Sequence, residues 1–246
     1  MGPMTGNDRR ILIAIPAYNE AGTIAAVIDR VRSSLPNCDL LVVNDGSGDA
    51  TEQILKERRV TIATHLCNLG YGRAIQTAIM CAIKGGYDAL ITLDADGQHK
   101  PEQLQDLLRE FEASPCDVLI GSRYIASGNY RGAPLGRRVG MQLFSFLVRL
   151  FAGQRVYDTS SGLKIMRRTV FDPLTHWHFV DFHSEVIVYL MRLGYRVQEF
   201  PVTMGERTQG RSMYTLINHF KYPLKTSMLV VLGIIQAGLT RRRHES

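Results

Sequence analysis

The 246-residue chain lacks the run of about 18 uninterrupted apolar residues that a membrane-spanning helix requires. The nearest candidate, residues 228–239, is shorter and contains Gln236. No apolar signal-peptide core precedes the first predicted strand, so we expect a cytosolic protein. The four cysteines are scattered and form no C-x-x-C pair, which favours reduced thiols over a disulfide framework or a zinc site.

Acidic residues are scarce in the second half of the chain. Residues 1–117 carry 16 Asp and Glu against 11 Lys and Arg, whereas residues 118–246 carry 7 against 18. Two stretches, 118–157 and 207–244, contain no acidic residue at all. The acidic first half is typical of a metal site, and the basic second half indicates contact with an anion or an anionic surface.

Apolar runs alternate with helical periodicity along most of the chain. Strands are predicted at residues 10–15, 39–43, 60–64, 89–93, 117–121, 163–166 and 195–202. Helices are predicted at residues 21–35, 51–58, 73–84, 101–113, 141–151, 182–192 and 220–239, and residues 122–140 as a mobile loop. This order predicts an α/β fold with a mainly parallel sheet flanked by helices.

The stretch from residue 89 to residue 102 carries the strongest chemical signal. An apolar strand ends in two carboxylates, Asp94 and Asp96, and Gln98 adds an amide oxygen. Neighbouring carboxylates repel each other unless a cation or a hydrogen-bond network lies between them. Such oxygen ligands suit Mg²⁺ or Mn²⁺; the alternative is a turn in which the Asp residues cap the following helix.

Several polar residues share one position relative to the predicted strands. Glu20, Asp45, Asp94, Asp96 and Arg123 all come just after a strand. Ligands of doubly wound sheets bind outside the carboxyl ends of the strands. We therefore expect these five side chains to surround one site.

Five motifs then appear in a fixed order. They are IPAYNE at residues 15–20, VNDGS at 43–47, NLGYG at 68–72, LDADGQH at 93–99 and GSRY at 121–124. The ordered set resembles family 2 glycosyltransferases of the GT-A fold. Residues 158–163 (DTSSGL) and 207–212 (RTQGRS) are similar to later motifs of the dolichol-phosphate mannose synthase branch. The resemblance covers residues 10–225 and implies a GT-A catalytic domain at 1–212, followed by an apolar helix and a basic tail at 213–246.

The resemblance implies a nucleotide-diphosphate sugar as donor and Mg²⁺ or Mn²⁺ as cofactor. The residues implied at the base and ribose are Pro16, Tyr18, Glu20 and Asp45, with Gly72 and Arg73 flanking the nucleotide and Ala95 within the central motif. Asp94 would lie near the ribose and the metal, and Asp96 with Gln98 would bind the metal on the diphosphate. A metal and arginines neutralise the charge of a diphosphate leaving group without proton transfer.

The sugar acceptor of the resembled branch is a polyprenyl phosphate at the membrane surface. Arg123, Arg131 and Arg207 are candidates for phosphate contacts, since a guanidinium can bind a phosphate through two hydrogen bonds. Asp158 is the candidate for positioning the acceptor or assisting its attack, and the alternative is a carboxylate that caps a loop. Glu185 would orient an arginine or act as a base.

Both acid-free stretches contain a predicted apolar helix, at residues 141–151 and 220–239. Lys and Arg near an anionic leaflet each contribute on the order of 1 kcal/mol to membrane binding. We therefore expect amphipathic helices that hold the protein peripherally on the cytosolic face of a membrane, alone, as a homo-oligomer or with an anchoring subunit. The alternative is that these two helices belong to the hydrophobic core. No nucleic-acid partner is expected.

Three other functions stay open at this point. The same fold could act on a soluble or glycan acceptor, or the chain could be a non-catalytic nucleotide-sugar-binding subunit of a membrane complex. The third is a sugar-nucleotide-forming nucleotidyltransferase. That class usually has a Gly-rich basic loop after its first strand, and residues 16–20 of this chain, PAYNE, argue against it. Two departures from the branch pattern are Asn44, where many members have Asp, and Met213 in place of Lys.

Overall fold

The computed structural model describes residues 9–126, 135–203, 205 and 218–245. Its strands are β1 (Ile11–Ala17), β2 (Asp39–Asn44), β3 (Thr61–Thr64), β4 (Ala89–Thr92), β5 (Val118–Ser122), β6 (Lys164–Arg167) and β7 (Val197–Pro201). These seven strands form one sheet in the order β3-β2-β1-β4-β6-β5-β7. Only β6 runs against its neighbours β4 and β5, so the expected mainly parallel α/β sheet is confirmed.

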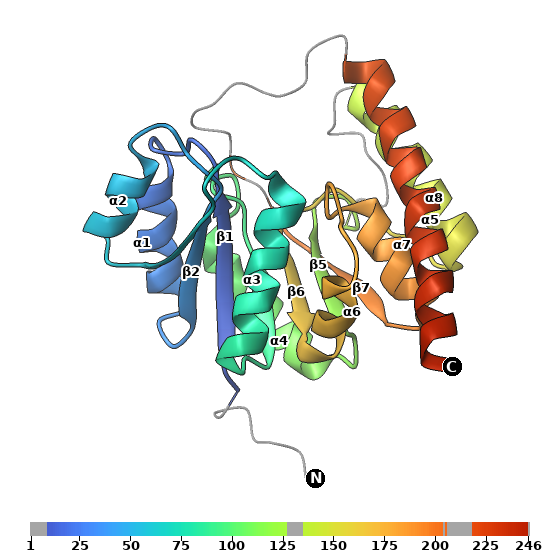
Figure 1. Ribbon diagram of the computed structural model, residues 1–246, viewed down its shortest axis with the longest axis horizontal. Helices are drawn as coiled ribbons and strands as arrows, with labels where there is room; N and C mark the ends of the chain where they lie inside the picture. The colour runs from blue at the N-terminus through green and yellow to red at the C-terminus, as the bar shows by residue number, and fades with distance from the viewer. Residues whose placement is uncertain (1–8, 127–134, 204, 206–217, 246) are drawn as a thin grey trace.

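Helices cover both faces of this sheet (Figure 1). They are α1 (Ile24–Ser34), α2 (Thr51–Glu57), α3 (Tyr71–Gly85), the 3₁₀ turn η1 (Pro101–Gln103), α4 (Leu104–Ala113), α5 (Leu135–Ala152), the 3₁₀ turn η2 (Arg168–Val170), α6 (Phe171–Thr175), α7 (Ser184–Arg192) and α8 (Asn218–Glu245). One core lies between the sheet and α1, α2 and α4, and a second lies between the sheet and α3, α5, α6, α7 and α8.

Strand β1 shows how one strand serves both cores. Ile11, Ile13 and Ile15 belong to the first core, and Leu12 and Ala14 belong to the second. Side chains alternate between the two faces of a strand, so a strand covered on both faces is apolar at nearly every position. The uninterrupted apolar runs in the sequence are explained by this arrangement.

The sequence predicted that the first strand ends at residue 15, before Pro16, but in the structure Pro16 lies within the strand. β1 continues to Ala17 and pairs Pro16 with Val43 of β2. On the other side the ladder with β4 stops at Ala14, so no neighbour there needs the N–H that proline lacks.

Three further segments differ from the expected secondary structure. Residues 135–140, expected within a mobile loop of residues 122–140, form the first turns of α5. Residues 168–175, which no pattern assigned, form η2 and α6. Helix α8 is longer than the expected 220–239.

Helix α8 packs on α7 and α5 along one side of the molecule (Figure 1). Its residues Val230 and Ala237 are buried in the same core as α7. The expected boundary at residues 212 and 213 lies outside the described residues. Within the described part of the chain, no helix combines the length and apolar character needed to cross a bilayer.

Candidate active site

The candidate site lies at the carboxyl edge of the sheet. Ala17 of β1 pairs with Asn44 of β2, and Thr92 of β4 pairs with Lys164 at the start of the reversed strand β6. β5 ends at Ser122, immediately before Arg123. The segments that carry the predicted site residues therefore leave the sheet at one edge, as the sequence indicated.

Asp94 follows the central strand β4 at this edge. Its side chain is 32% exposed; Oδ1 accepts a hydrogen bond from the Tyr71 hydroxyl at 3.3 Å, and Oδ2 lies 3.3 Å from His99 Nε2. Burial opposes ionisation, but the hydrogen bond and charge of His99, with the charges of His183 and Lys164, lower the pKa of Asp94 to about 2. Asp94 is therefore an anion at neutral pH.

The backbone of Gly162 forms one wall beside Asp94. A Cβ atom added at Gly162 would overlap both carboxylate oxygens of Asp94. The carbonyl of Gly162 accepts a hydrogen bond of 2.6 Å from the Thr92 hydroxyl, which ties this loop to the end of β4. Only glycine leaves room for a carboxylate at this place.

Asp96 and Gln98 complete the candidate metal site. Both are partly exposed, and the backbone N–H of Gln98 donates to Asp96 Oδ1 at 3.0 Å. Among the described residues, no group of three His, Cys, Asp or Glu side chains could hold a metal. Two carboxylates and one amide oxygen fit a Mg²⁺ or Mn²⁺ ion that takes its other ligands from water and substrate phosphates.

Ala95, between the two Asp residues, is buried in the core with Leu93. Its methyl group faces the packed side of the loop, so a nucleotide would meet Ala95 only through its backbone.

Asp45 is buried and bonded on both oxygens. Oδ1 lies 2.6 Å from His65 Nδ1 and accepts from Leu69 N at 2.9 Å, and Oδ2 accepts from Gly70 N at 2.8 Å. His65 Nε2 in turn lies 2.8 Å from the Thr77 hydroxyl on α3. In this structure Asp45 fixes the start of α3, and its predicted contact with base or ribose stays a prediction.

The loop after β1 carries the other predicted nucleotide contacts. Tyr18 is 47% exposed, Pro16 is half-buried, and Glu20 accepts a hydrogen bond from the Thr23 hydroxyl at 3.0 Å. The backbone N–H of Glu20 donates to Thr51 at the start of α2. The loop is thus held against α2 while the Tyr18 ring stays available to a ligand.

Gly72 and Arg73 begin helix α3. A Cβ atom at Gly72 would overlap the carbonyl oxygen of Phe179, and the N–H of Gly72 donates to the carbonyl of Val180 at 3.3 Å. Close packing against residues 179–180 therefore explains this glycine. Arg73 is exposed in the first turn and reaches Gln76 at 3.5 Å.

Arg123 and Asp158 form a buried ion pair. Arg123 Nε and Nη2 donate to the two oxygens of Asp158 at 2.6 and 2.7 Å, and Asp158 is 0% exposed. The other candidate phosphate-binding residues, Arg131 and Arg207, lie outside the described residues.

Glu185 lies in the first turn of helix α7. Its Oε1 accepts hydrogen bonds from the backbone N–H groups of Asp181 at 2.9 Å and Phe182 at 3.0 Å, and the side chain is buried. The carboxylate thus bonds to the backbone of the segment that leads into α7, and no hydrogen bond to an arginine is present among the described residues. The two roles expected for Glu185, orienting an arginine or acting as a base, stay predictions.

The comparisons with known proteins agree with this geometry. The sequence profile described as "Glycosyl transferase family 2" matches residues 12–175, from β1 to the end of α6. The chain belongs to glycosyl transferase family 2. Its enzymatic class, glycosyltransferase, follows from this membership and from the relatives it matches.

Three curated relatives of this family 2 glycosyltransferase are 30–32% identical to it over the matched residues. Polyprenol monophosphomannose synthase of Mycolicibacterium smegmatis is 32% identical over 83% of this chain and 80% of the relative. Undecaprenyl-phosphate mannosyltransferase of Micrococcus luteus is 30% identical over 82% of this chain and 86% of the relative. UDP-N-acetylglucosamine–dolichyl-phosphate N-acetylglucosaminyltransferase of Methanococcus voltae is 30% identical over 68% and 73%.

A solved structure confirms the GT-A-type fold. Glucosyl-3-phosphoglycerate synthase from Mycobacterium tuberculosis, in complex with Mn²⁺ and UDP-glucose, superposes with a TM-score of 0.67. The two chains are 17% identical, and the match covers 92% of this chain and 79% of the other.

Sequence reasoning missed several residues of this glycosyltransferase's site. Tyr71 and His99 lay inside the recognised motifs, but nothing in the sequence showed that both contact Asp94. Lys164 lies within the predicted strand 163–166 and is buried in the structure, and a buried lysine is often a functional residue. Burial lowers the pKa of Lys164 to about 8, although Asp94 and Asp158 favour its charged form.

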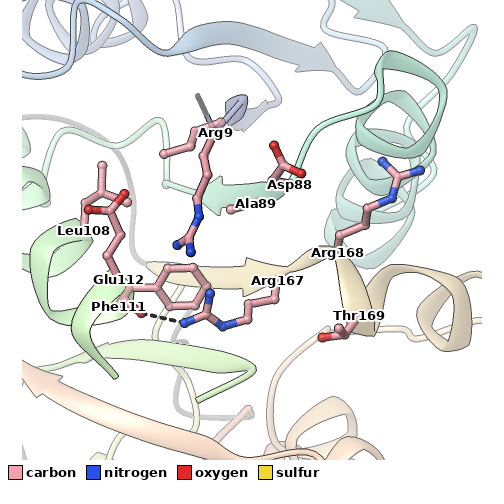
Figure 2. Close-up of a pocket in the computed structure, with 10 residues that line it drawn as sticks. Arg9, Asp88, Ala89, Leu108, Phe111, Glu112, Arg167, Arg168 and Thr169 are labelled. Carbon is pink, nitrogen blue, oxygen red and sulfur yellow. Dashed lines mark hydrogen bonds between the residues drawn. The ribbon is translucent and has the colours of Figure 1, made fainter. Parts of the chain in front are cut away.

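A pocket lies at the opposite end of the sheet of this glycosyltransferase (Figure 2). Arg9 precedes β1, Asp88 precedes β4 and Arg167 ends β6, so the pocket is at the amino edge of β1 and β4. Figure 2 shows the guanidinium of Arg167 bonded to the carbonyl of Phe111, at 2.8 Å. This pocket contains none of the motif residues and is not part of the candidate site.

Proposed function

We propose that this enzyme transfers one sugar from a nucleoside-diphosphate sugar to a polyprenyl phosphate, with inversion, at the cytosolic face of a membrane. The observation that carries the proposal is the set of three relatives at 30–32% identity, whose names specify polyprenol, undecaprenyl phosphate and dolichyl phosphate. Each match spans at least 68% of this chain, so the similarity extends well beyond one motif.

Asp94, Asp96 and Gln98 would hold Mg²⁺ or Mn²⁺ against the donor diphosphate. When bound, the ion neutralises the charge that develops on the diphosphate as the sugar leaves. The ionised state of Asp94 and the Mn²⁺ in the structural neighbour support this assignment. The remaining residues proposed to surround the nucleotide are Pro16, Tyr18, Glu20, Asp45, Gly72, Arg73 and Ala95.

The phosphate of the sugar acceptor would meet arginines rather than a base. A phosphate oxygen is already an anion at neutral pH, so its attack does not require a strong general base. Arg123 is supported by its place at the carboxyl end of β5, on the same sheet edge as Asp94, with which it interacts electrostatically. Arg131 and Arg207 are proposed from the sequence alone.

An apolar surface supports action at a membrane. Helices α5 and α8 pack against each other and expose large apolar side chains at helical spacing. This apolar stripe consists of Leu143, Phe146, Leu150, Met228, Val231, Leu232, Ile235 and Leu239. Neither helix contains an acidic residue before Glu245, and Arg149, Arg241 and Arg242 are exposed beside the stripe. Apolar and cationic side chains together suit an anionic lipid surface better than a solvent-facing one.

Transfer of labelled sugar tests the function directly. Wild-type protein is incubated with undecaprenyl or dolichyl phosphate, one of GDP-mannose, UDP-glucose or UDP-N-acetylglucosamine, and either Mn²⁺ or EDTA. We expect a labelled lipid from one donor, and loss on the order of 100-fold with EDTA or in Asp96→Ala, because charge stabilisation of the leaving group is removed. Thermal stabilisation by the matching nucleotide should be lost under the same two conditions.

Asp106→Ala is the matched control, since Asp106 is an exposed carboxylate on α4 that pairs with Arg109 of the same helix. It should keep full activity. Label that appears only on a soluble glycan would overturn the lipid acceptor. Failure of every nucleotide to stabilise the protein would contradict the donor class and favour a different role for the fold.

A further inference from the structure

A buried network joins the end of β5 to the loop before β6. Arg123 donates to Asp158 three times: its backbone N–H and Nε reach Oδ2 at 3.0 and 2.6 Å, and its Nη2 reaches Oδ1 at 2.7 Å. The Ser160 hydroxyl lies 3.3 Å from Oδ1 and 3.0 Å from Nη2. A carboxylate offers roughly four lone-pair sites, so Asp158 has none left for a substrate.

Glu199 holds this loop from the other side. It lies on β7 at the position that pairs with Ile120 of β5. Its Oε2 accepts from the backbone N–H of Tyr157 and its Oε1 from that of Asp158, both at 2.8 Å. Glu199 thus fixes the backbone of Asp158, and the carboxylate of Asp158 in turn binds Arg123.

The described hydrogen bonds of the Arg123 guanidinium lie along one edge, and its Cζ lies 5.3 Å from the centroid of the Tyr124 ring. Nε and Nη2 face Asp158 and Ser160, while no hydrogen bond to Nη1 is present among the described residues. The side chain is 20% exposed and interacts electrostatically with Asp94, the candidate metal ligand. An arginine ordered in this way can bind an anion at its remaining edge with little further loss of side-chain entropy.

We propose that Asp158 and Glu199 are positioning residues for Arg123. Asp158 acts by orienting the guanidinium, and Glu199 acts by fixing the backbone that carries Asp158. The anion that Arg123 meets is the phosphate of the sugar acceptor, and this last point rests on the proposed function. The geometry therefore assigns Asp158 a role different from direct contact with the acceptor or assistance to its attack.

Steady-state kinetics separate a positioning role from a base. We expect the acceptor KM to rise on the order of 10-fold or more in Arg123→Lys and Asp158→Asn, and less in Glu199→Gln, because each loses charge-assisted hydrogen bonds around one guanidinium. The donor KM should stay unchanged, and the pH profile of kcat should keep its shape in Asp158→Asn. Arg123→Lys combined with Asp158→Asn should equal the single Arg123→Lys variant, since both act through one group.

Asp29→Asn is the matched control, because Asp29 also pairs with an arginine, Arg58, but at the surface between α1 and α2. Removing one partner of a buried pair can destabilise the fold. Arg123→Gln combined with Asp158→Asn leaves no unpaired charge, so its melting temperature should stay near the wild-type value while its acceptor KM remains raised. A loss of kcat in Asp158→Asn with the acidic limb of the pH profile abolished would make Asp158 a base and overturn the proposal.

An NMR measurement tests the positioning without any transfer reaction. The ¹⁵N-coupled Nε–H signal of Arg123, assigned by its absence in Arg123→Lys, should exchange slowly with water in the wild type. Exchange should become on the order of 10-fold faster in Asp158→Asn and measurably faster in Glu199→Gln, as expected when a buried hydrogen bond is lost. Unchanged exchange in both variants would refute the positioning role, whereas slow wild-type exchange without any lipid product would contradict only the proposed function.

Discussion

Two glycines at this site are needed because neighbouring atoms leave no room for a side chain. Gly162 lies so close to the carboxylate of Asp94 that no side chain fits between them, and Gly72 lies equally close to the carbonyl of Phe179. Interiors are packed too densely to absorb even one methyl group without a shift of the neighbouring atoms. The glycine of the DTSSGL motif therefore has a steric role, next to a residue with a chemical one.

Gly162→Ala should displace Asp94 and damage the candidate metal site. We expect activity to fall on the order of 100-fold, since an electrostatic contribution to leaving-group stabilisation is lost when Asp94 moves. The stabilisation of the protein by Mn²⁺ with nucleotide should fall in parallel. Both are measured on purified protein by the transfer assay and by thermal unfolding.

Gly238→Ala is the control for this substitution, because a Cβ atom at Gly238 meets no other atom within 4 Å. Alanine is favoured over glycine within a helix by roughly 0.5–1 kcal/mol, so this variant should be slightly more stable and fully active. If Gly162→Ala binds Mn²⁺ and nucleotide like the wild type, the close approach to Asp94 has no functional consequence.

At the scale of elements, buried carboxylates bind the backbone segments that lead into two helices, α3 and α7. Asp45 accepts from Leu69 and Gly70 before α3, and Glu185 accepts from Asp181 and Phe182 before α7. Negative charge near a helix amino end also interacts favourably with the helix dipole. The sheet edge and the starts of these two helices are therefore held together by side chains that need not touch a substrate.

Glu185 provides a test that depends on pH. Burial raises the pKa of Glu185 above its ordinary 4.5, with Asp181 adding to this effect, against the backbone hydrogen bonds and Lys225. The folded state therefore binds the proton more tightly than the unfolded state, so stability falls as pH rises from 4.5 through the raised value. Glu185→Gln keeps an oxygen for both backbone bonds, and it should gain stability relative to the wild type across this window and stay level above it.

Urea unfolding between pH 4 and pH 7 measures the difference between wild type and variant. Glu185→Ala, which loses both bonds, should be about 1–2 kcal/mol less stable than the wild type at pH 7. Glu110→Gln, at an exposed position of α4, should show a difference that does not change with pH in this way. A pH-independent difference for Glu185→Gln would contradict the assigned environment of Glu185.

At the scale of the whole molecule, the charge division of the sequence becomes a division in space. Most residues proposed to bind the nucleotide follow β1, β2 and β4, whereas helices α5 and α8, which carry the apolar stripe, lie together along the other side (Figure 1). Large exposed apolar patches mark interaction sites.

The stripe predicts binding to anionic membranes. Wild-type protein should co-sediment with vesicles of phosphatidylglycerol and phosphatidylcholine more than with phosphatidylcholine alone, since basic side chains add electrostatic attraction to apolar insertion. Phe146→Glu and Ile235→Glu, at side chains 59% and 54% exposed, should each weaken binding by about 10-fold or more.

Met80→Glu is the matched control, because Met80 is 62% exposed on α3, away from the stripe. It should bind vesicles like the wild type. Equal and negligible binding of wild-type protein to both kinds of vesicle would exclude the stripe as a membrane surface.

Local patterns in the sequence were sufficient for most elements and for the edge at which the site lies. Runs such as residues 89–93 are apolar because strands covered on both faces have no solvent side, and this is visible without knowing which strands pair. The start of α5 was not visible, since Gly136 and Gly140 lower helix propensity and packing against α7 and α8 overrides it. Pro134 comes just before that helix in the sequence, and proline is common at the start of helices.

By itself, the sequence determined the family, the alternation of strands and helices, the placement of Asp94 and Asp96 after a central strand, and the imbalance of charge. Only the tertiary structure decided that β6 runs against its neighbours, that Arg123 and Ser160 occupy the carboxylate of Asp158, that Asp45 and Glu185 bind backbone, and that α5 and α8 pack together. The physical reason is that a motif fixes which groups a segment carries. Whether a carboxylate meets solvent, a ligand or another group depends on how the chain folds around it, and the partners of Asp45 and Asp158 include residues more than 20 positions away.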